Sequence, residues 1–133
     1  MSRAVQLRFL VVDDNEDIRD VFCRLVERAG HHASTAGDGQ EAVDLLGVES
    51  FDVMLLDLTM PRMNGVDVVR WLRAHPDVAP SMKIVVISAW AGEHRAVLQE
   101  LGIDTVMQKP LRIQQLTDLI SQTLLDLESG SRP

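Results

Sequence analysis

The sequence predicts an α/β fold in which one parallel sheet is covered by helices on both faces, a doubly wound arrangement. Five short and largely apolar runs alternate with segments whose apolar residues recur at helical spacing. Parallel strands that are buried on both faces read as continuous apolar runs, and their alternation with amphipathic helices is typical of repeated βα units. A length of 133 residues with 46% hydrophobic residues suits a single globular domain.

The first two strand–helix units are predicted from apolar periodicity and turn residues. Residues 7–12 form an apolar run that is too short for a core helix, and 31–36 form a weaker second strand. Between them, apolar residues recur at steps of three and four up to Gly30, which predicts an amphipathic helix that ends at this glycine. Asp38 with Glu41 three residues later is an acidic version of the capping box and predicts the start of the second helix.

The remaining chain repeats this pattern. Further strands are predicted at 53–56, 83–88 and 104–108. Further helices are predicted at 64–75, 93–101 and 111–127. The domain is therefore expected to span 7–127, with 1–6 as an N-terminal extension and 128–133 as a flexible tail or linker stub.

Composition limits the possible functions. The net charge of −7 argues against non-specific binding to nucleic acid, which needs clustered lysine and arginine, but it is compatible with an acidic site for a metal cation. Cys23 is the one cysteine, so it has no partner for an internal disulfide, which suits a reducing compartment. The sequence shows no signal-peptide pattern and no stretch long enough to span a bilayer, and we expect a cytoplasmic protein without membrane insertion.

The ends of four predicted strands carry polar or charged residues that could take part in binding or catalysis. These are Asp13 and Asp14, Asp57, Ser88 and Ala89, and Lys109 and Pro110. The carboxyl ends of parallel strands share one edge of the sheet, so we expect three carboxylates, a hydroxyl and an ammonium to converge there. Crowded carboxylates repel one another, and a hard cation such as Mg²⁺ with oxygen ligands relieves that repulsion. With a lysine beside them, they indicate a site for phosphoryl transfer.

Four motifs occur in order on these strand ends: VVDDN, LLDLTMPRMNG, VVISA and QKP. Together they resemble the receiver domain of two-component response regulators, and the chain is similar in size and motifs to the single-domain chemotaxis regulator. The resemblance runs from about residue 7 to 127. It implies a flavodoxin-like (βα)5 fold, with a five-stranded parallel sheet in strand order 2-1-3-4-5.

The resemblance also implies the chemistry of the site. Asp57 would accept a phosphoryl group from a phosphohistidine on a sensor histidine kinase or a phosphotransfer protein. The Mg²⁺ ligands would be Asp13, Asp14, Asp57 and the backbone carbonyl of Thr59. Such a domain is a signalling switch for a downstream protein target and not an enzyme acting on other substrates, although it assists its own phosphorylation and dephosphorylation.

The phosphoryl group would have contacts of its own. Ser88 and the backbone amide of Ala89 would bind its oxygens, and Lys109 would pair with Asp57 or its phosphate. We expect Lys109 to be solvated until this negative charge develops. Pro110 would hold the lysine loop through a cis peptide bond.

One position departs from the family pattern. Receivers often have an aromatic residue three positions before the lysine, which turns inward on activation, and here that position is Val106. A switch based on an aromatic rotamer is therefore absent. The expected partners are the kinase or phosphotransfer protein and a target protein, with a homodimer through the last strands and helices as a further possibility.

Other interpretations stay open at this stage. The acidic pair at 13–14 could simply cap the first helix, and Asp57 could be a structural acid paired with Lys109. A receiver-like interaction module that works without phosphorylation is the main alternative function. The DxDx[TV] motif of aspartyl phosphatases and the glycine-rich loop of a cofactor protein do not occur after the first strand. The histidines lack metal-ligand spacing and are expected at the surface: His31, His32, His75 and His94.

Overall fold

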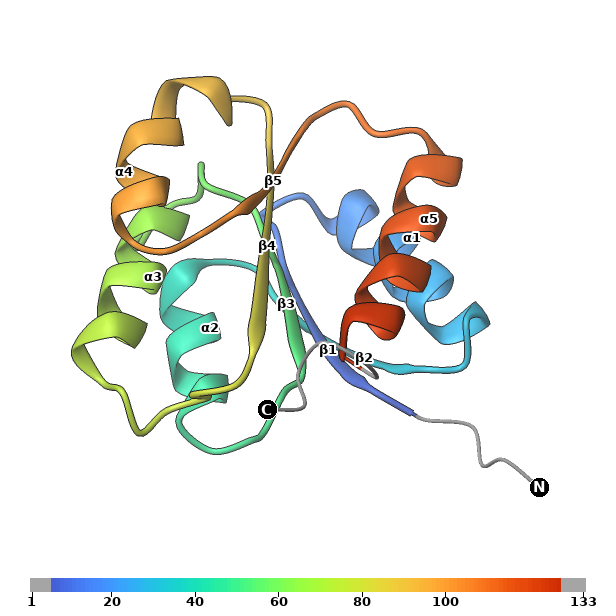
Figure 1. Cartoon of the computed structure of the whole chain (residues 1–133), viewed down its shortest axis with the longest axis horizontal. Coiled ribbons are helices and arrows are strands. Elements are labelled where there is room, and N and C mark those ends of the chain that lie inside the picture. Colours follow the sequence, from blue (N-terminus) through green and yellow to red (C-terminus); the bar gives the residue numbers. More distant parts are fainter. Residues whose placement is uncertain (1–5, 128–133) are drawn as a thin grey trace.

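Five parallel strands form one sheet in the computed structural model, which describes residues 6–127 (Figure 1). The strands are β1 Arg8–Val12, β2 His32–Ala36, β3 Val53–Leu56, β4 Lys83–Ser88 and β5 Thr105–Gln108. Their order in the sheet is β2-β1-β3-β4-β5, so the predicted flavodoxin-like topology is confirmed. The chain ends at 1–5 and 128–133, which include the predicted flexible tail, lie outside the described residues.

Helices cover both faces of this sheet. They are α1 Glu16–Arg28, α2 Gly39–Leu46, α3 Gly65–Ala74, the 3-10 turn η1 Gly92–His94, α4 Arg95–Glu100 and α5 Ile113–Leu125. In Figure 1, α1 and α5 lie on one side of the sheet, and α2, α3 and α4 lie on the other. Within residues 6–127, no helix combines the length and hydropathy that crossing a membrane requires.

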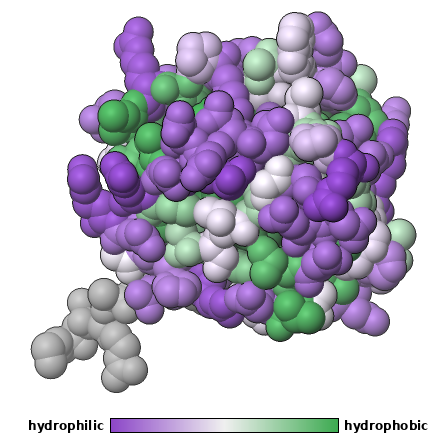
Figure 2. Space-filling model, turned by 180° about the vertical axis from the view of Figure 1, so that it is seen from behind, coloured by the Kyte–Doolittle hydropathy of each residue, from purple (hydrophilic) through white to green (hydrophobic). Residues whose placement is uncertain are grey.

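The central strands are buried because both of their faces are covered. Side chains alternate between the two faces of a strand, and β3 divides its residues in this way. Met54 and Leu56 pack into the core under α2 and α3, whereas Val53 and Leu55 pack into the core under α1 and α5. All four are at most 2% exposed, which explains the uninterrupted apolar run before Asp57. Seen from behind, the outer surface is mostly hydrophilic, with hydrophobic residues in small separate areas (Figure 2).

Side-chain caps fix where three helices begin. Asn15, Asp38 and Asn64 each accept the backbone N–H of the third residue after them through a side-chain oxygen, at 3.1, 2.8 and 2.9 Å. Such caps satisfy a backbone donor that the first helical turn leaves unpaired. The predicted helix starts at Asp38 and Asn64 are confirmed. Several predicted ends shift by one or two residues: β1, β2 and β5 each begin one residue later than predicted, and α5 is shorter than 111–127 at both ends. The helix predicted at 93–101 divides into η1 and α4.

One prediction about the histidines is wrong. His31 is only 5% exposed, whereas the sequence predicted a surface position. Its Nδ1 atom accepts the backbone N–H of Leu7 at 3.1 Å, and its ring lies 5.6 Å from the ring of Phe9. Burial lowers the pKa of His31 from its ordinary value of 6.5, because the charged form loses its hydration.

This burial predicts a loss of stability in mild acid. As the pH is lowered below 6.5, the unfolded chain binds the proton before the folded chain does. The free energy of unfolding therefore decreases as the pH decreases. The loss is at most about 1.4 kcal/mol per pH unit. Urea unfolding at pH 7.5 and 5.5 measures it, and His31→Gln, whose amide oxygen can still accept the Leu7 N–H, should lose less than the wild type. The exposed His32→Gln is the control, and an equal acid loss in His31→Gln would contradict the prediction.

Candidate functional site

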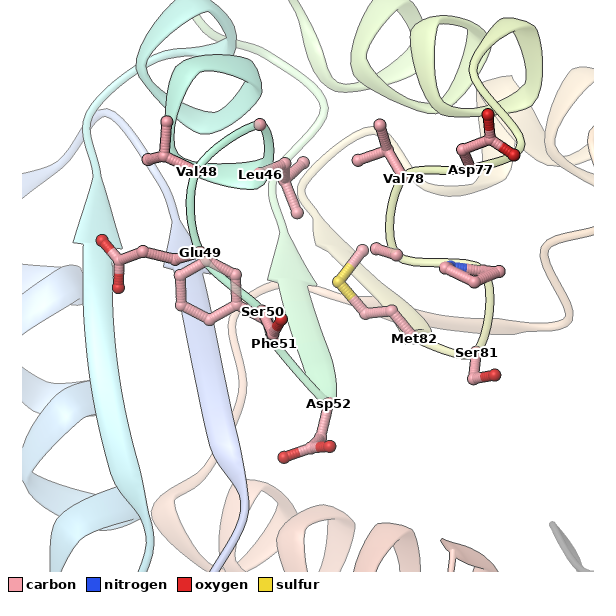
Figure 3. A pocket seen from close by; sticks show the side chains of 13 residues that line it. Leu46, Val48, Glu49, Ser50, Phe51, Asp52, Asp77, Val78, Ser81 and Met82 are labelled. Atoms are coloured by element: carbon pink, nitrogen blue, oxygen red, sulfur yellow. The ribbon is translucent and has the colours of Figure 1, made fainter.

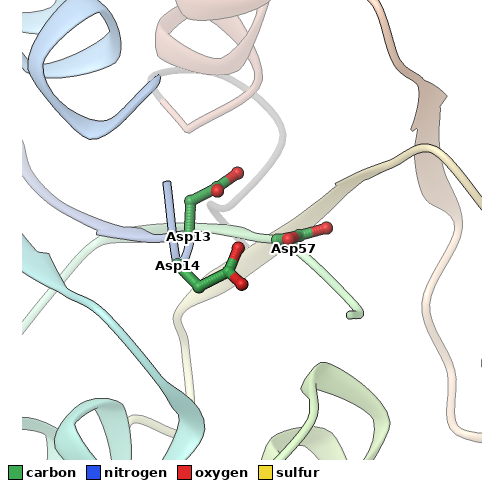
Figure 4. A group of neighbouring side chains, drawn as sticks. All are labelled: Asp13, Asp14 and Asp57. Atoms are coloured by element: carbon green, nitrogen blue, oxygen red, sulfur yellow. The ribbon is translucent and has the colours of Figure 1, made fainter. Parts of the chain in front are cut away.

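Three acids meet at the carboxyl ends of β1 and β3 (Figure 4). Asp13, Asp14 and Asp57 each offer a carboxylate oxygen, and these atoms lie within 4.8 Å of one another. The backbone N–H of Asp57 donates to the carbonyl of Val12 at 2.9 Å, which continues the pairing of β3 with β1 and sets the acids side by side. Asp13 and Asp57 are buried at 2% and 6% exposure, whereas Asp14 is exposed to solvent.

Lys109 lies between the two buried carboxylates. Its Nζ atom is 2.6 Å from Oδ2 of Asp13 and 3.7 Å from Oδ1 of Asp57, with 17% of the side chain exposed. The expectation that Lys109 is solvated is therefore wrong, because two buried like charges already attract the ammonium. The backbone N–H of Lys109 donates to the Ser88 carbonyl at 3.0 Å, and the Lys109–Pro110 peptide bond is cis, as the family resemblance implied.

Burial raises the pKa of the Asp57 carboxyl above its ordinary value of 3.8. The ammonium of Lys109 opposes this effect, and the neighbouring charge of Asp13 adds to it. Hydrogen bonds from the backbone N–H groups of Thr59 and Leu58 also lower the pKa. Burial outweighs these stabilising contacts, so the ionised Asp57 is incompletely compensated within the described structure.

The other predicted site residues lie at the ends of neighbouring strands. Ser88 is fully buried at the end of β4, and its hydroxyl oxygen accepts the backbone N–H of Trp90 at 3.2 Å. This contact leaves the hydroxyl hydrogen available as a donor. Ala89 is exposed, and its carbonyl accepts the side-chain amide of Gln108 at 2.5 Å. Thr59 is exposed beside Asp57, two residues further along the chain.

Gly65 has a role that sequence reasoning missed. A Cβ atom at this position would lie only 2.3 Å from the carbonyl oxygen of Asp57, and the N–H of Gly65 donates to the Leu58 carbonyl at 2.9 Å. The sequence indicated turn residues at Asn64 and Gly65, but no pattern shows that α3 begins in backbone contact with the acid. The glycine therefore lets α3 close the loop that follows Asp57.

The donor set suits a hard divalent cation. It offers three carboxylates, of which Asp14 is open to water, and Thr59, whose carbonyl the resemblance implies as a ligand, follows Asp57 two residues along the chain. Carboxylate and carbonyl oxygens with retained waters are typical of Mg²⁺ sites. One lysine against three acids leaves an excess of negative charge, which a divalent cation would neutralise.

Another hollow lies away from the acids. A cavity of about 470 Å³ opens between the loops before β3 and β4, where Phe51, Val78 and Met82 line it (Figure 3). These loops are at the opposite end of the strands from the acids (Figure 1). A smaller and largely apolar hollow of about 330 Å³ adjoins Lys109, and its lining includes Ile18, Val21, Phe22, Pro110 and Leu111.

Comparison with known proteins identifies relatives of the sequence. The family model described as "Response regulator receiver domain" matches residues 9–121. Sensory/regulatory protein RpfC of Xanthomonas campestris is 33% identical, with 98% of this chain and 18% of the relative covered. Transcriptional regulatory protein CpxR of Escherichia coli is also 33% identical, with 88% of this chain and 49% of the relative covered. The chain thus spans less than half the length of these relatives.

Solved structures show the same fold. A CheY-like response regulator receiver domain from Methanospirillum hungatei superposes with a TM-score of 0.84 at 26% identity, covering 95% of this chain and 99% of the other. The chemotaxis response regulator CheY4 of Vibrio cholerae superposes with a TM-score of 0.81 at 25% identity, covering 90% and 99%. Both likenesses extend over nearly the whole chain.

The raised pKa of Asp57 predicts that Asp57→Asn stabilises the fold. Above pH 3.8 the unfolded chain loses this proton more readily than the folded chain, so ionisation favours unfolding. Removing the charge should raise the free energy of unfolding at pH 7 by about 1 kcal/mol, or roughly 4 °C in Tm. Calorimetry at pH 7 and pH 4 should show the gain shrinking in acid.

An exposed acid provides the control for this measurement. Asp20→Asn removes the same charge from the solvent side of α1 and should leave Tm almost unchanged. A destabilised Asp57→Asn would instead identify Asp57 as a favourable member of an ion pair with Lys109.

Proposed function

Because the chain belongs to the response regulator receiver domain family of two-component signalling, we propose that Asp57 accepts a phosphoryl group with the help of Mg²⁺. The donor is a phosphohistidine on a sensor histidine kinase or a phosphotransfer protein. The observation that carries the proposal is Lys109 lying between the buried Asp13 and Asp57 beside a third carboxylate. In this arrangement Asp57 would be the nucleophile, and Lys109 with a bound cation would neutralise the charge of an incoming phosphoryl group.

The transfer follows from the positions of these groups. A carboxylate oxygen of Asp57 attacks phosphorus, the P–N bond breaks, and its electron pair goes to the imidazole nitrogen of the donor histidine. Lys109 is within 4 Å of both Asp13 and Asp57, so a small rotation brings its ammonium onto the phosphoryl oxygens. The Ser88 hydroxyl donates its hydrogen to another of these oxygens, with the Ala89 amide beside it. Mg²⁺ held by Asp13, Asp14, Asp57 and the Thr59 carbonyl would supply further positive charge at the transferring group.

The output of the proposed reaction is a change of surface. If Ser88 turns toward the phosphoryl group, its oxygen releases the backbone N–H of Trp90. Trp90 lies in the loop after β4, and the residue is 51% exposed. The new charge would thereby alter a surface that a target protein reads. The domain would act as a switch and would not turn over an external substrate.

The partners are part of the same proposal. The apolar hollow beside Lys109 supports docking of the donor protein through Val21 and Phe22, close to the acceptor. Ile113 is 66% exposed at the start of α5, which supports contact with a target or a second copy of the chain there. For the kinase and the target, we propose only the kind of protein, and the same holds for the activity of any longer protein. A cytoplasmic location, predicted from the sequence, belongs to the same proposal.

Phosphorylation can be tested without the natural partner. Incubation with acetyl phosphate and Mg²⁺ should add the mass of one phosphoryl group to the intact protein, and Asp57→Ala should abolish the adduct. Asp20→Asn should behave as the wild type, and chelation of Mg²⁺ should reduce the adduct to background. An equal adduct on Asp57→Ala would refute the assignment, and no adduct on the wild type would favour an interaction module that works without phosphorylation.

The switch predicts a fluorescence change at Trp90. Beryllofluoride with Mg²⁺ mimics the phosphoryl group, and it should change tryptophan emission because the Ser88 oxygen releases the Trp90 backbone. Trp71→Phe should keep the change, since Trp71 in α3 is stacked on His75, just after the helix, with ring centroids 4.3 Å apart. Trp90→Phe should lose it. A Trp90→Phe protein with the full change would mean that the loop after β4 does not carry the switch.

A further inference from the structure

Arg62 lies in an unusual backbone conformation between Asp57 and α3. Its φ angle is +66°, in the left-handed region that residues with a Cβ atom rarely adopt. The N–H of Met63 donates to the Pro61 carbonyl at 2.7 Å, so the chain closes a three-residue turn around Arg62. A positive φ in such a turn is the strained form, and it persists only where surrounding contacts hold it.

Asp38 supplies the contact that holds this turn. Its Oδ2 atom accepts from Nε of Arg62 at 2.9 Å and also from Nη2 of the same guanidinium. Its Oδ1 atom accepts the backbone N–H of Glu41 at 2.8 Å, as the cap of α2. Asp38 is only 7% exposed, so α2 holds the carboxylate in place and the guanidinium docks onto it.

The backbone supports the same contact. A Cβ atom at Gly39 would lie 2.0 Å from the carbonyl oxygen of Met63, so the first residue of α2 touches the loop directly. The loop is therefore attached to α2 by an ion pair at Arg62 and by close packing at Met63. These two attachments are adjacent in sequence and restrain the same part of the loop.

This loop reaches the acid that we propose as the acceptor. One end of the loop is formed by Leu58 and Thr59, the two residues after Asp57, whose backbone N–H groups lower the pKa of its carboxyl. At the other end, the Gly65 N–H donates to the Leu58 carbonyl at 2.9 Å. A shift of the turn at Arg62 would therefore pass through only a few residues to the groups that orient Asp57 and to the Thr59 carbonyl.

We propose that Arg62 is a positioning residue, whose ion pair with Asp38 holds loop 58–63 in the geometry that Mg²⁺ binding at Asp57 requires. The inference rests on the proposed function, because it concerns the same metal site. Among the contacts of the described residues, none joins Arg62 to Asp13, Asp14 or Asp57. Arg62 therefore acts through the loop that carries Thr59.

Charge alone predicts a different result. Removing the positive charge of Arg62 would strengthen Mg²⁺ binding through long-range electrostatics, and removing the negative charge of Asp38 would weaken it. If the ion pair positions the loop, both substitutions weaken binding. In that case the double variant is no weaker than either single variant, because each removes the same contact.

The test is Mg²⁺ titration by calorimetry on the whole chain. Arg62→Gln and Asp38→Asn should each raise the Kd for Mg²⁺ about tenfold, a size typical of contacts that orient metal ligands. Asparagine keeps the capping oxygen of α2, so Asp38→Asn retains the helix start. The matched control is Arg70→Gln on α3, where the arginine lies 3.9 Å from Asp67, and its Kd should stay within about twofold.

Arg62→Gly separates positioning from folding. Glycine adopts a positive φ without strain, so this variant can still form the turn but lacks the guanidinium that attaches it to α2. It should fold with a similar circular dichroism spectrum and still bind Mg²⁺ more weakly. In the metal-free protein, amide hydrogen exchange at 58–63 should be faster than in the wild type, whereas exchange in β1 should be unchanged.

The outcomes distinguish this inference from the proposed function. A wild-type chain that binds no Mg²⁺ would overturn the proposed function and the inference together. A wild-type chain that binds Mg²⁺, with Arg62→Gln binding equally or more tightly, would overturn the inference alone. Unchanged amide exchange at 58–63 in Arg62→Gly would also overturn it.

Discussion

The burial of two neighbouring carboxylates is the constraint on which the rest of the site depends. The N–H of Asp13 donates to Ala36 at 3.2 Å and that of Asp57 donates to Val12 at 2.9 Å, so the sheet itself fixes both acids at one edge. The backbone of neither residue can move away without breaking these hydrogen bonds. Lys109 offsets part of the cost, but burial still raises the pKa of Asp57, which is consistent with incomplete compensation. A cation or a phosphoryl group with its counter-charges would therefore bind where the folded chain already lacks positive charge.

The sequence predicted the strands and the convergence of the acids because both depend on simple geometry. Apolar runs mark buried parallel strands, and parallel strands end at a shared edge, so Asp13 and Asp57 had to lie close together. The pairing of Lys109 with Asp57 was predicted, but its shorter contact with Asp13 was not, since that contact depends on the path of the loop after β5. The burial of His31 was missed for a similar reason. Its hydrogen bond to Leu7 joins residues 24 positions apart, and nothing in the weak second strand signals it.

The loop after Asp57 illustrates how local rules fail at a site under constraint. The segment TMPRMNG after Asp57 is rich in turn residues, but nothing in it predicts that Arg62 adopts a positive φ or that Asp38 holds it. The sequence assigned Asp38 only the role of a helix cap, which uses one of its two carboxylate oxygens. The second oxygen is free to bind Arg62 because the cap needs only one. A single side chain thus joins the start of α2 to the loop that orients Asp57.

Val106 changes how a signal could leave the site. Without an aromatic side chain on β5, the contacts that lead away from Ser88 run through the loop after β4. The Ser88 oxygen binds the N–H of Trp90, and the Trp90 carbonyl lies 3.0 Å from Nδ1 of His94 and 3.2 Å from the N–H of Glu93, both in η1. The turn η1 and helix α4 are short, and short elements with few buried side chains open more easily than the core. If Asp57 carries the phosphoryl group, η1 and α4 are the elements that a change at Ser88 reaches first. An aromatic rotamer is then unnecessary, because the backbone contact at Trp90 already links the site to the surface.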